Sequence, residues 1–145
     1  MLIKCEDRLS KATVISILER FDMSFNDPLH NIIDFFVYGE KLSLYAHFIL
    51  AYDEKELIGF IAYYINKEGG VAYVPFVAVH PKGRHRGVGH LMFSYLSGML
   101  PVEIDQIRLE VKESNVNALN FYQREGFHVL SGPREGKYML NKNMK

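Results

Sequence analysis

The sequence has little of what marks several large classes of protein. Its 145 residues include one cysteine, Cys5, and no tryptophan. A single cysteine excludes an intramolecular disulfide framework and a cysteine-rich zinc site. No apolar run approaches the roughly 18 residues of a membrane-spanning helix, and the charged first residues lack the apolar core of a signal peptide. The composition therefore predicts a soluble cytoplasmic protein with no membrane partner.

A net charge is also lacking. The 17 Lys and Arg residues balance the 17 Asp and Glu residues, whereas a dedicated nucleic-acid-binding domain usually carries a clear basic excess. We therefore expect no nucleic-acid partner. With 48% hydrophobic and 23% charged residues, the chain has the composition of a globular protein. Its length predicts a single domain over residues 1–145.

The spacing of apolar residues predicts an α/β fold. One-sided helical spacing predicts helices over residues 10–21, 27–38, 87–100 and 115–125, the second of them capped by Asp27. Alternating or continuous apolar stretches predict strands over residues 46–51, 57–65, 71–79, 107–111, 127–130 and 137–140, the last two joined through residues 132–133. The strand at 71–79 is apolar enough to be buried on both faces. Pro75 in its middle cannot donate a ladder hydrogen bond, which indicates a bulge.

A glycine-containing loop carries the strongest chemical signal. It leaves the strand at 71–79 and opens the next helix, for which we expect an inner face of Leu91, Met92, Tyr95, Leu96 and Met99. Gly87 and Gly89 allow a ligand to approach the backbone closely, and free N–H groups at a helix start attract phosphate. Positive charge is added by Lys82, Arg84 and Arg86. Neither a Walker P-loop nor a full dinucleotide fingerprint matches, so the alternatives are another phosphate loop or a plain surface turn.

The motif Arg84-x-x-Gly87-x-Gly89 resembles the acetyl-CoA pyrophosphate loop of the GCN5-related N-acetyltransferase (GNAT) superfamily. Residues 76–81 are similar to the end of that family's fourth strand. Residues 109–111, with Asn115-x-x-Ala118-x-x-x-Tyr122-x-x-x-Gly126-Phe127, resemble its fifth strand and the following helix. This resemblance covers residues 58–130. It implies a single-domain α/β fold whose mixed, mostly antiparallel central sheet has flanking helices and splayed fourth and fifth strands.

The resemblance also implies acetyl-CoA as co-substrate and no metal. The pantetheine arm pairs in this family with the strand backbone, here Val77, Ala78 and Val79, which otherwise form a plain core strand. The pyrophosphate binds the loop backbone, here Arg84, His85, Arg86, Gly87, Val88 and Gly89, with His90 at the edge. His85 is a departure, because a glycine is common there. Asn115 is a natural N-cap and in the family also contacts the cofactor. The Arg84 and Arg86 side chains either add contacts or face solvent.

Two residues are candidates for proton transfer. Tyr122 stands where the family places the general acid that protonates the departing thiolate; the alternative is a core tyrosine beside Phe121. Glu110 is a candidate base or water-orienting residue, as in the branch that resembles ribosomal-protein and N-terminal acetyltransferases. Otherwise it is a strand carboxylate paired with a neighbouring Lys or Arg. Many members carry a glutamate where this chain has Tyr73, so Tyr73 or ordered water are further candidates for the base.

These observations predict an acetyl-CoA-dependent N-acetyltransferase, in which a primary amine of a small molecule or peptide attacks the thioester directly. The alternative is a non-catalytic acyl-CoA-binding module of the same fold. Residues 1–66 hold 6 basic and 10 acidic residues and residues 67–145 hold 11 and 7, which suggests an acidic side for a cationic acceptor. The acceptor's identity stays open. Family members are often dimers, so a homodimer is compatible with the resemblance.

Overall fold

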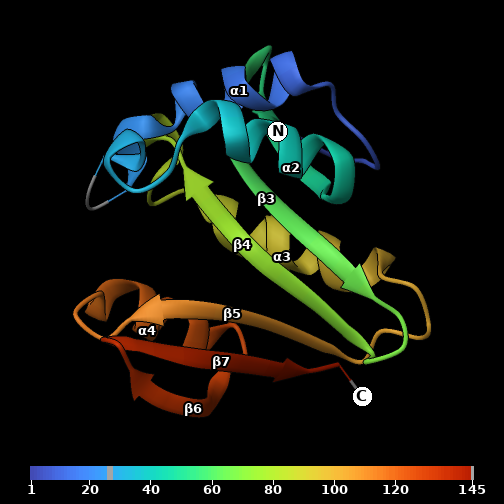
Figure 1. Cartoon of the computed structure of the whole chain (residues 1–145), viewed down its shortest axis with the longest axis vertical. Coiled ribbons are helices and arrows are strands. Elements are labelled where there is room, and N and C mark those ends of the chain that lie inside the picture. Colours follow the sequence, from blue (N-terminus) through green and yellow to red (C-terminus); the bar gives the residue numbers. More distant parts are fainter. Residues whose placement is uncertain (26–27, 145) are drawn as a thin grey trace. The chain divides into compact units, whose positions relative to one another are not determined.

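The structure is a computed structural model that describes residues 1–25 and 28–144 (Figure 1). The strands are β1 (Leu2–Glu6), β2 (His47–Asp53), β3 (Glu56–Asn66), β4 (Val71–Val79), β5 (Gln106–Lys112), β6 (His128–Arg134) and β7 (Lys137–Asn143). The helices are α1 (Lys11–Arg20), α2 (Phe35–Tyr45), α3 (Val88–Met99) and α4 (Val116–Arg124), with short 3-10 helices η1 (Asp22–Ser24), η2 (Leu29–Asn31) and η3 (Pro81–Gly83). Among these residues no helix is long and apolar enough to cross a membrane.

Within the described residues the strands form one mixed sheet, in the order β1-β2-β3-β4-β5-β7-β6. β4 and β5 run parallel, whereas the β1–β2, β2–β3, β5–β7 and β6–β7 pairs are antiparallel. This confirms the predicted mixed, mostly antiparallel α/β sheet. The pairing of β4 with β5 covers the first three residues of each strand, Val71–Tyr73 and 106–108. Pro75 follows two residues later and has no N–H to donate.

The chain divides into two compact units. The N-terminal unit comprises Met1–Tyr63 and Phe76–Leu96, and the C-terminal unit comprises Tyr64–Pro75 and Ser97–Lys145. The boundary falls within β3 and β4, so each of these strands contributes residues to both units. The expectation of a single domain stays a prediction.

In the N-terminal unit, α1 follows the prediction. The Ser10 hydroxyl accepts a hydrogen bond from the Thr13 N–H at 3.2 Å and so caps the helix. Val14 and Phe21 are fully buried, and the Phe21 ring packs on Phe60 with 5.1 Å between centroids. The predicted periodicity of one apolar face therefore forms the start of this unit's core.

The second predicted helix, over residues 27–38, is wrong in position. Within its described part, Leu29–Asn31 form the single 3-10 turn η2 and the last four residues already belong to α2. The predicted cap Asp27 lies outside the described residues. α2 begins at Phe35 because Asp34 caps it: the Asp34 carboxylate accepts from the N–H groups of Phe36 at 2.8 Å and Val37 at 3.1 Å. The prediction named Asp27 as the cap, whereas Asp34 begins the α-helix.

β1 is absent from the predicted elements. It pairs antiparallel with β2, with Lys4 opposite Leu50 and Cys5 opposite Ile49. Charged residues interrupt its apolar pattern, and one side of the strand is exposed. The β1–β2 pairing joins residues more than 40 positions apart. The local sequence pattern around β1 therefore does not predict the strand.

Two buried faces also differ from prediction. β4 is not buried on both faces: Ala72, Val74 and Ala78 are buried, whereas their neighbours are partly exposed. In α3 the buried residues are Val88, Met92, Phe93 and Leu96, while the predicted inner residues Leu91, Tyr95 and Met99 are 37–42% exposed. α3 is apolar around much of its circumference, so its composition left the angle of the buried face undetermined.

In the C-terminal unit, β7 pairs antiparallel with both β5 and β6 and lies between them. Residues 132–133, predicted as the link between the last strands, instead lie inside β6. The turn is Glu135-Gly136, and both residues have left-handed φ values, 52° and 77°. Two consecutive left-handed residues are typical of the tight turn that matches the twist of a hairpin. The β6–β7 hairpin is therefore longer than predicted and places its turn beside Arg134 and Lys137.

Candidate functional site

The predicted loop, residues 80–89, is held firmly at its strand end. The His80 N–H donates to the Ile58 carbonyl oxygen at 2.8 Å, and the His80 Nδ1 accepts from the Lys82 N–H at 3.2 Å. Gly83 is buried, and a Cβ there would meet Ile58 and Val79 at 3.3 Å. α3 begins at Val88, which is also buried. The exposed residues 84–87 thus connect two buried positions, Gly83 and Val88.

The exposed part of this loop has a backbone suited to an anion. His85 and Gly87 adopt left-handed φ values of 63° and 75°, and left-handed residues in a turn aim successive N–H groups into a concave, anion-binding surface. No atom lies within 4 Å of the position that a Cβ of Gly87 would take. The N–H groups that open α3 add the positive end of the helix dipole. The loop therefore presents an open cradle of N–H groups.

The basic side chains of this loop do not simply face solvent. Arg86 Nη1 donates to Asp53 Oδ2 at 2.7 Å, and Arg84 Nη2 donates to the Ser24 carbonyl oxygen at 3.1 Å. Lys82 pairs with Glu56 at 3.2 Å. The hydrogen bond and charge of Arg86 lower the pKa of Asp53. These contacts tie the loop to the β2–β3 hairpin and to η1, a bracing role that the sequence analysis did not foresee.

The left-handed conformation of His85 explains why a glycine is common at this position. A non-glycine residue in this region costs about 1–2 kcal/mol, whereas glycine loses backbone entropy of about 0.5–1 kcal/mol. We expect His85→Gly to change the free energy of unfolding by less than about 1 kcal/mol. A β-branched residue tolerates this φ least, so His85→Val should lower it by about 1 kcal/mol. Urea denaturation measures both values, and a valine variant as stable as the parent would contradict the left-handed loop.

The end of β4 packs as expected for a strand with one core face. Ala78 is 5% exposed, whereas Val77 and Val79 are partly exposed. Their backbone contact with a cofactor, like that of the loop residues Arg84 to Gly89, stays a prediction. His90 is exposed in the first turn of α3, and its place at the edge of a site is likewise untested.

In the C-terminal unit, Asn115 caps α4 as predicted. Its Oδ1 accepts from the Ala118 N–H at 3.2 Å. An asparagine at this position satisfies one of the free N–H groups at the helix start. Its second predicted role, contact with a cofactor, stays a prediction.

Tyr122 is a core residue of α4. It is 9% exposed and lies between aromatic rings, with centroid distances of 5.2 Å to Phe121 and 5.4 Å to Phe127. Burial raises the pKa of the Tyr122 phenol well above its usual range, because a phenolate loses its hydration in apolar surroundings. The phenol is therefore neutral at physiological pH and retains a proton to donate. This is compatible with the core interpretation and with the general-acid interpretation.

Glu110 lies on the face of β5 opposite the core. Alternate residues of β5, such as Leu109 and Val111, are buried, whereas Glu110 is exposed opposite Met139 of β7. Within residues 1–25 and 28–144 the carboxylate makes no ion pair, so the predicted pairing with a neighbouring Lys or Arg does not occur. Burial, and then the negative charge of Glu110, raise the pKa of Tyr73. The two alternative base candidates thus lie within electrostatic range of each other.

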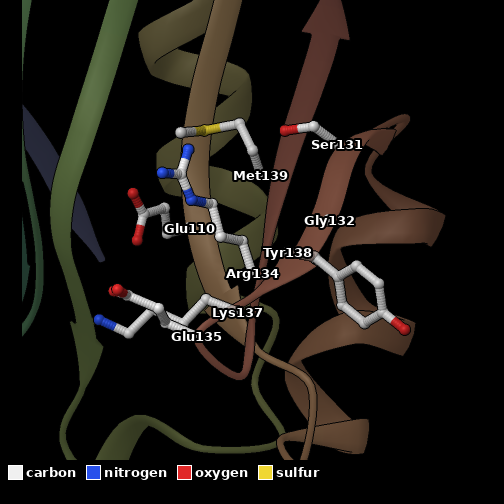
Figure 2. A pocket seen from close by; sticks show the side chains of 8 residues that line it. All are labelled: Glu110, Ser131, Gly132, Arg134, Glu135, Lys137, Tyr138 and Met139. Atoms are coloured by element: carbon white, nitrogen blue, oxygen red, sulfur yellow. The ribbon is translucent and has the colours of Figure 1, made fainter.

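Glu110 also lines a cavity that the sequence analysis missed. Figure 2 shows the side chains that line it. The cavity has a volume of about 340 Å³. The remaining lining residues are Ser131, Gly132, Arg134, Glu135, Lys137, Tyr138 and Met139. A signal was present in the charged residues flanking Glu135-Gly136. The predicted link at residues 132–133 lies three residues before the observed turn and therefore does not bring these charges together.

The structure distributes the predicted residues over both units. The strand and loop residues 77–90 all belong to the N-terminal unit, and Glu110, Asn115 and Tyr122 belong to the C-terminal unit. Within the C-terminal unit, Tyr73 aligns with Arg108 in the β4–β5 ladder. It therefore shares the sheet face of Glu110, since that face alternates along β5.

Comparisons with known proteins agree with this fold. The model of the acetyltransferase (GNAT) family matches residues 14–127. Peptidyl-lysine N-acetyltransferase YiaC of Escherichia coli (strain K12) is 35% identical over 78 residues, which are 54% of this chain and 47% of that protein. The match thus spans about half the length of this curated relative.

Solved structures share the fold over nearly the whole chain. Aminoglycoside 6'-acetyltransferase type Ii has a TM-score of 0.81 at 16% identity, covering 100% of this chain and 98% of that one. The PaiA N-acetyltransferase from Thermoplasma acidophilum in complex with coenzyme A has a TM-score of 0.76 at 20% identity, covering 99% of both chains. At these identities the likeness concerns the fold alone. Because the family model spans residues 14–127, which are most of the chain, this protein belongs to the acetyltransferase (GNAT) family.

Proposed function

We propose that this protein is an acetyl-CoA-dependent N-acetyltransferase that transfers an acetyl group to a primary amine. The open loop before α3 carries the proposal, because its left-handed residues His85 and Gly87 present backbone N–H groups with no side chain in front of Gly87. Such a surface suits the pyrophosphate of coenzyme A. The relatives named as N-acetyltransferases, one of them in complex with coenzyme A, support the same activity.

The reaction is a direct transfer. The amine nitrogen attacks the thioester carbonyl carbon, the carbon–sulfur bond breaks, and the acetyl group ends as an amide. The backbone N–H of Val77 or Val79 polarises the carbonyl and stabilises the oxyanion. Glu110 first takes a proton from the ammonium group, directly or through water, so that the neutral amine can attack. The Tyr122 phenol donates a proton to the leaving thiolate, and the second proton that the nitrogen loses returns to the phenol through water.

Glu110 is proposed as the base because a lysine-like amine has a pKa of about 10.4 and starts protonated. We expect Glu110→Gln to lower kcat by about 10²-fold or more. The matched control is Glu113→Gln, an exposed glutamate three residues further on, which should leave kcat unchanged. Initial rates over a range of pH provide the measurement. A Glu110→Gln variant within threefold of the parent would move the role of base to Tyr73 or to water.

The activity itself is tested by the release of free coenzyme A thiol from acetyl-CoA. The panel contains a blocked peptidyl lysine, a peptide with a free N-terminus, a polyamine and an aminoglycoside, with mass spectrometry to locate the acetyl group. Amine-dependent thiol release supports the proposal. Tight binding of acetyl-CoA with no release for any amine would favour the non-catalytic acyl-CoA-binding module.

A further inference from the structure

The cavity of the C-terminal unit is lined by charges of both signs. Two carboxylates, Glu110 and Glu135, and two cations, Arg134 and Lys137, surround the space of about 340 Å³. In Figure 2 these four side chains extend to one side of the sheet, whereas Tyr138 points to the other. The strand register agrees, because Glu110 stands opposite Met139 and Lys112 stands opposite Lys137.

Within the described residues, these four charged side chains form no ion pair that would stabilise the fold. Ion pairs do form elsewhere in the described chain, for example between Arg86 and Asp53 at 2.7 Å. None of the ion pairs among residues 1–25 and 28–144 includes Glu110, Arg134, Glu135 or Lys137. The nearby Arg108 hydrogen-bonds neutral amides instead, with Nε donating to Asn141 Oδ1 at 3.0 Å. The four charged side chains around the cavity are therefore available to a ligand.

We infer that this cavity binds the acceptor, and that the acceptor carries a carboxylate close to its amine; this inference rests on the proposed acetyltransfer. Glu110 attracts the ammonium group that is to be acetylated. Arg134 and Lys137 bind the carboxylate, since a guanidinium and a carboxylate form paired hydrogen bonds. The chemical class is a lysine side chain in a peptide with an acidic residue directly beside it.

The size and surroundings of the cavity fit a peptide. About 340 Å³ lies at the lower end of the range for ligand sites, enough for a lysine and one neighbouring side chain. All residues of β6 are exposed, so a longer chain can continue past the cavity. A polycation fits less well, because Arg134 and Lys137 repel its additional positive charges. The proposed acceptor keeps the cationic amine expected from the acidic first half of the sequence and adds a neighbouring carboxylate.

The test uses three blocked peptides that differ at one position: Gly-Lys-Glu-Gly, Gly-Lys-Gln-Gly and Gly-Lys-Arg-Gly, N-acetylated and C-amidated. Each offers one acetylatable amine. With the full chain we expect kcat/KM to be about tenfold higher for the Glu peptide than for the Gln peptide, equivalent to about 1.4 kcal/mol, and lowest for the Arg peptide. Isothermal titration calorimetry without acetyl-CoA measures the same order in peptide affinity.

The double variant Arg134→Glu/Lys137→Glu should reverse the order, so that the Arg peptide becomes the best. A reversal cannot arise from a loss of folding. The control Arg124→Glu makes the same kind of charge reversal once, at an exposed position of α4 outside the cavity, and should keep the original order. Equal kcat/KM values for the three peptides, or an unreversed order in the double variant, would overturn the inference.

The two proposals can fail separately. If thiol release occurs but the peptides do not differ, the acetyltransferase stands and the acceptor class is wrong. If no amine is acetylated, the proposed function fails. The calorimetric order and its reversal then still decide whether the cavity binds a peptide through its charges.

Discussion

Tyr122→Phe should lower kcat by about 10²–10⁴-fold, the usual contribution of a general acid, while the dissociation constant of acetyl-CoA stays within about twofold. The thiolate leaves without its proton when the phenol is absent. The packing is preserved, because phenylalanine keeps the ring contacts with Phe121 and Phe127. Single-turnover rates and calorimetric titration with acetyl-CoA measure the two quantities. Tyr52→Phe, on β2, is the matched control and should change neither.

The pH dependence follows from the burial of Tyr122. Because burial raises the phenol's pKa in the folded chain, the neutral form favours folding. This contribution to stability is fully present below the unfolded pKa of about 10 and is lost as the pH rises through the folded value. The parent should therefore show no loss of rate from Tyr122 ionisation below about pH 10. Unchanged turnover of Tyr122→Phe would remove this residue from the mechanism.

Gly89→Glu should abolish acetyl-CoA binding, with a loss of affinity of at least about 100-fold, or about 2.7 kcal/mol. The new carboxylate would occupy the first turn of α3, where the N–H groups and the helix dipole attract an anion. It would both fill the approach to the backbone and repel the pyrophosphate. Folding should survive, because glutamate has a higher helix propensity than glycine and is favoured near a helix N-terminus.

Calorimetric titration with coenzyme A measures the affinity of the Gly89→Glu variant, and a thermal melt of each variant shows whether it is folded. Gly98→Glu is the control: it lies near the other end of α3, and no atom occurs within 4 Å of the position of its Cβ. It should bind coenzyme A as the parent does. Tight binding retained by a folded Gly89→Glu variant would show that the loop is not the cofactor site.

Much of the fold was predictable because it depends on local patterns. Val71 to Val79 forms a strand with the predicted bounds, since a continuous apolar run ends at a turn on each side. α1 and α4 begin where Ser10 and Asn115 cap them. The order of strand, loop and helix around Gly87 was also predictable, because it too depends on local patterns. The second helix is the exception, because the prediction capped it with Asp27, whereas Asp34 caps α2.

By itself the sequence determined the α/β class, most elements, the loop before α3 and its family resemblance, because caps, turns and periodicity act between residues close in the chain. Only the tertiary structure decided that Arg84 and Arg86 brace the loop. It alone showed Glu110 unpaired within the described residues and facing a charged cavity. The bracing contacts join residues 60 and 33 positions apart. The cavity depends on the register of β5 with β7 and on the turn at Glu135-Gly136.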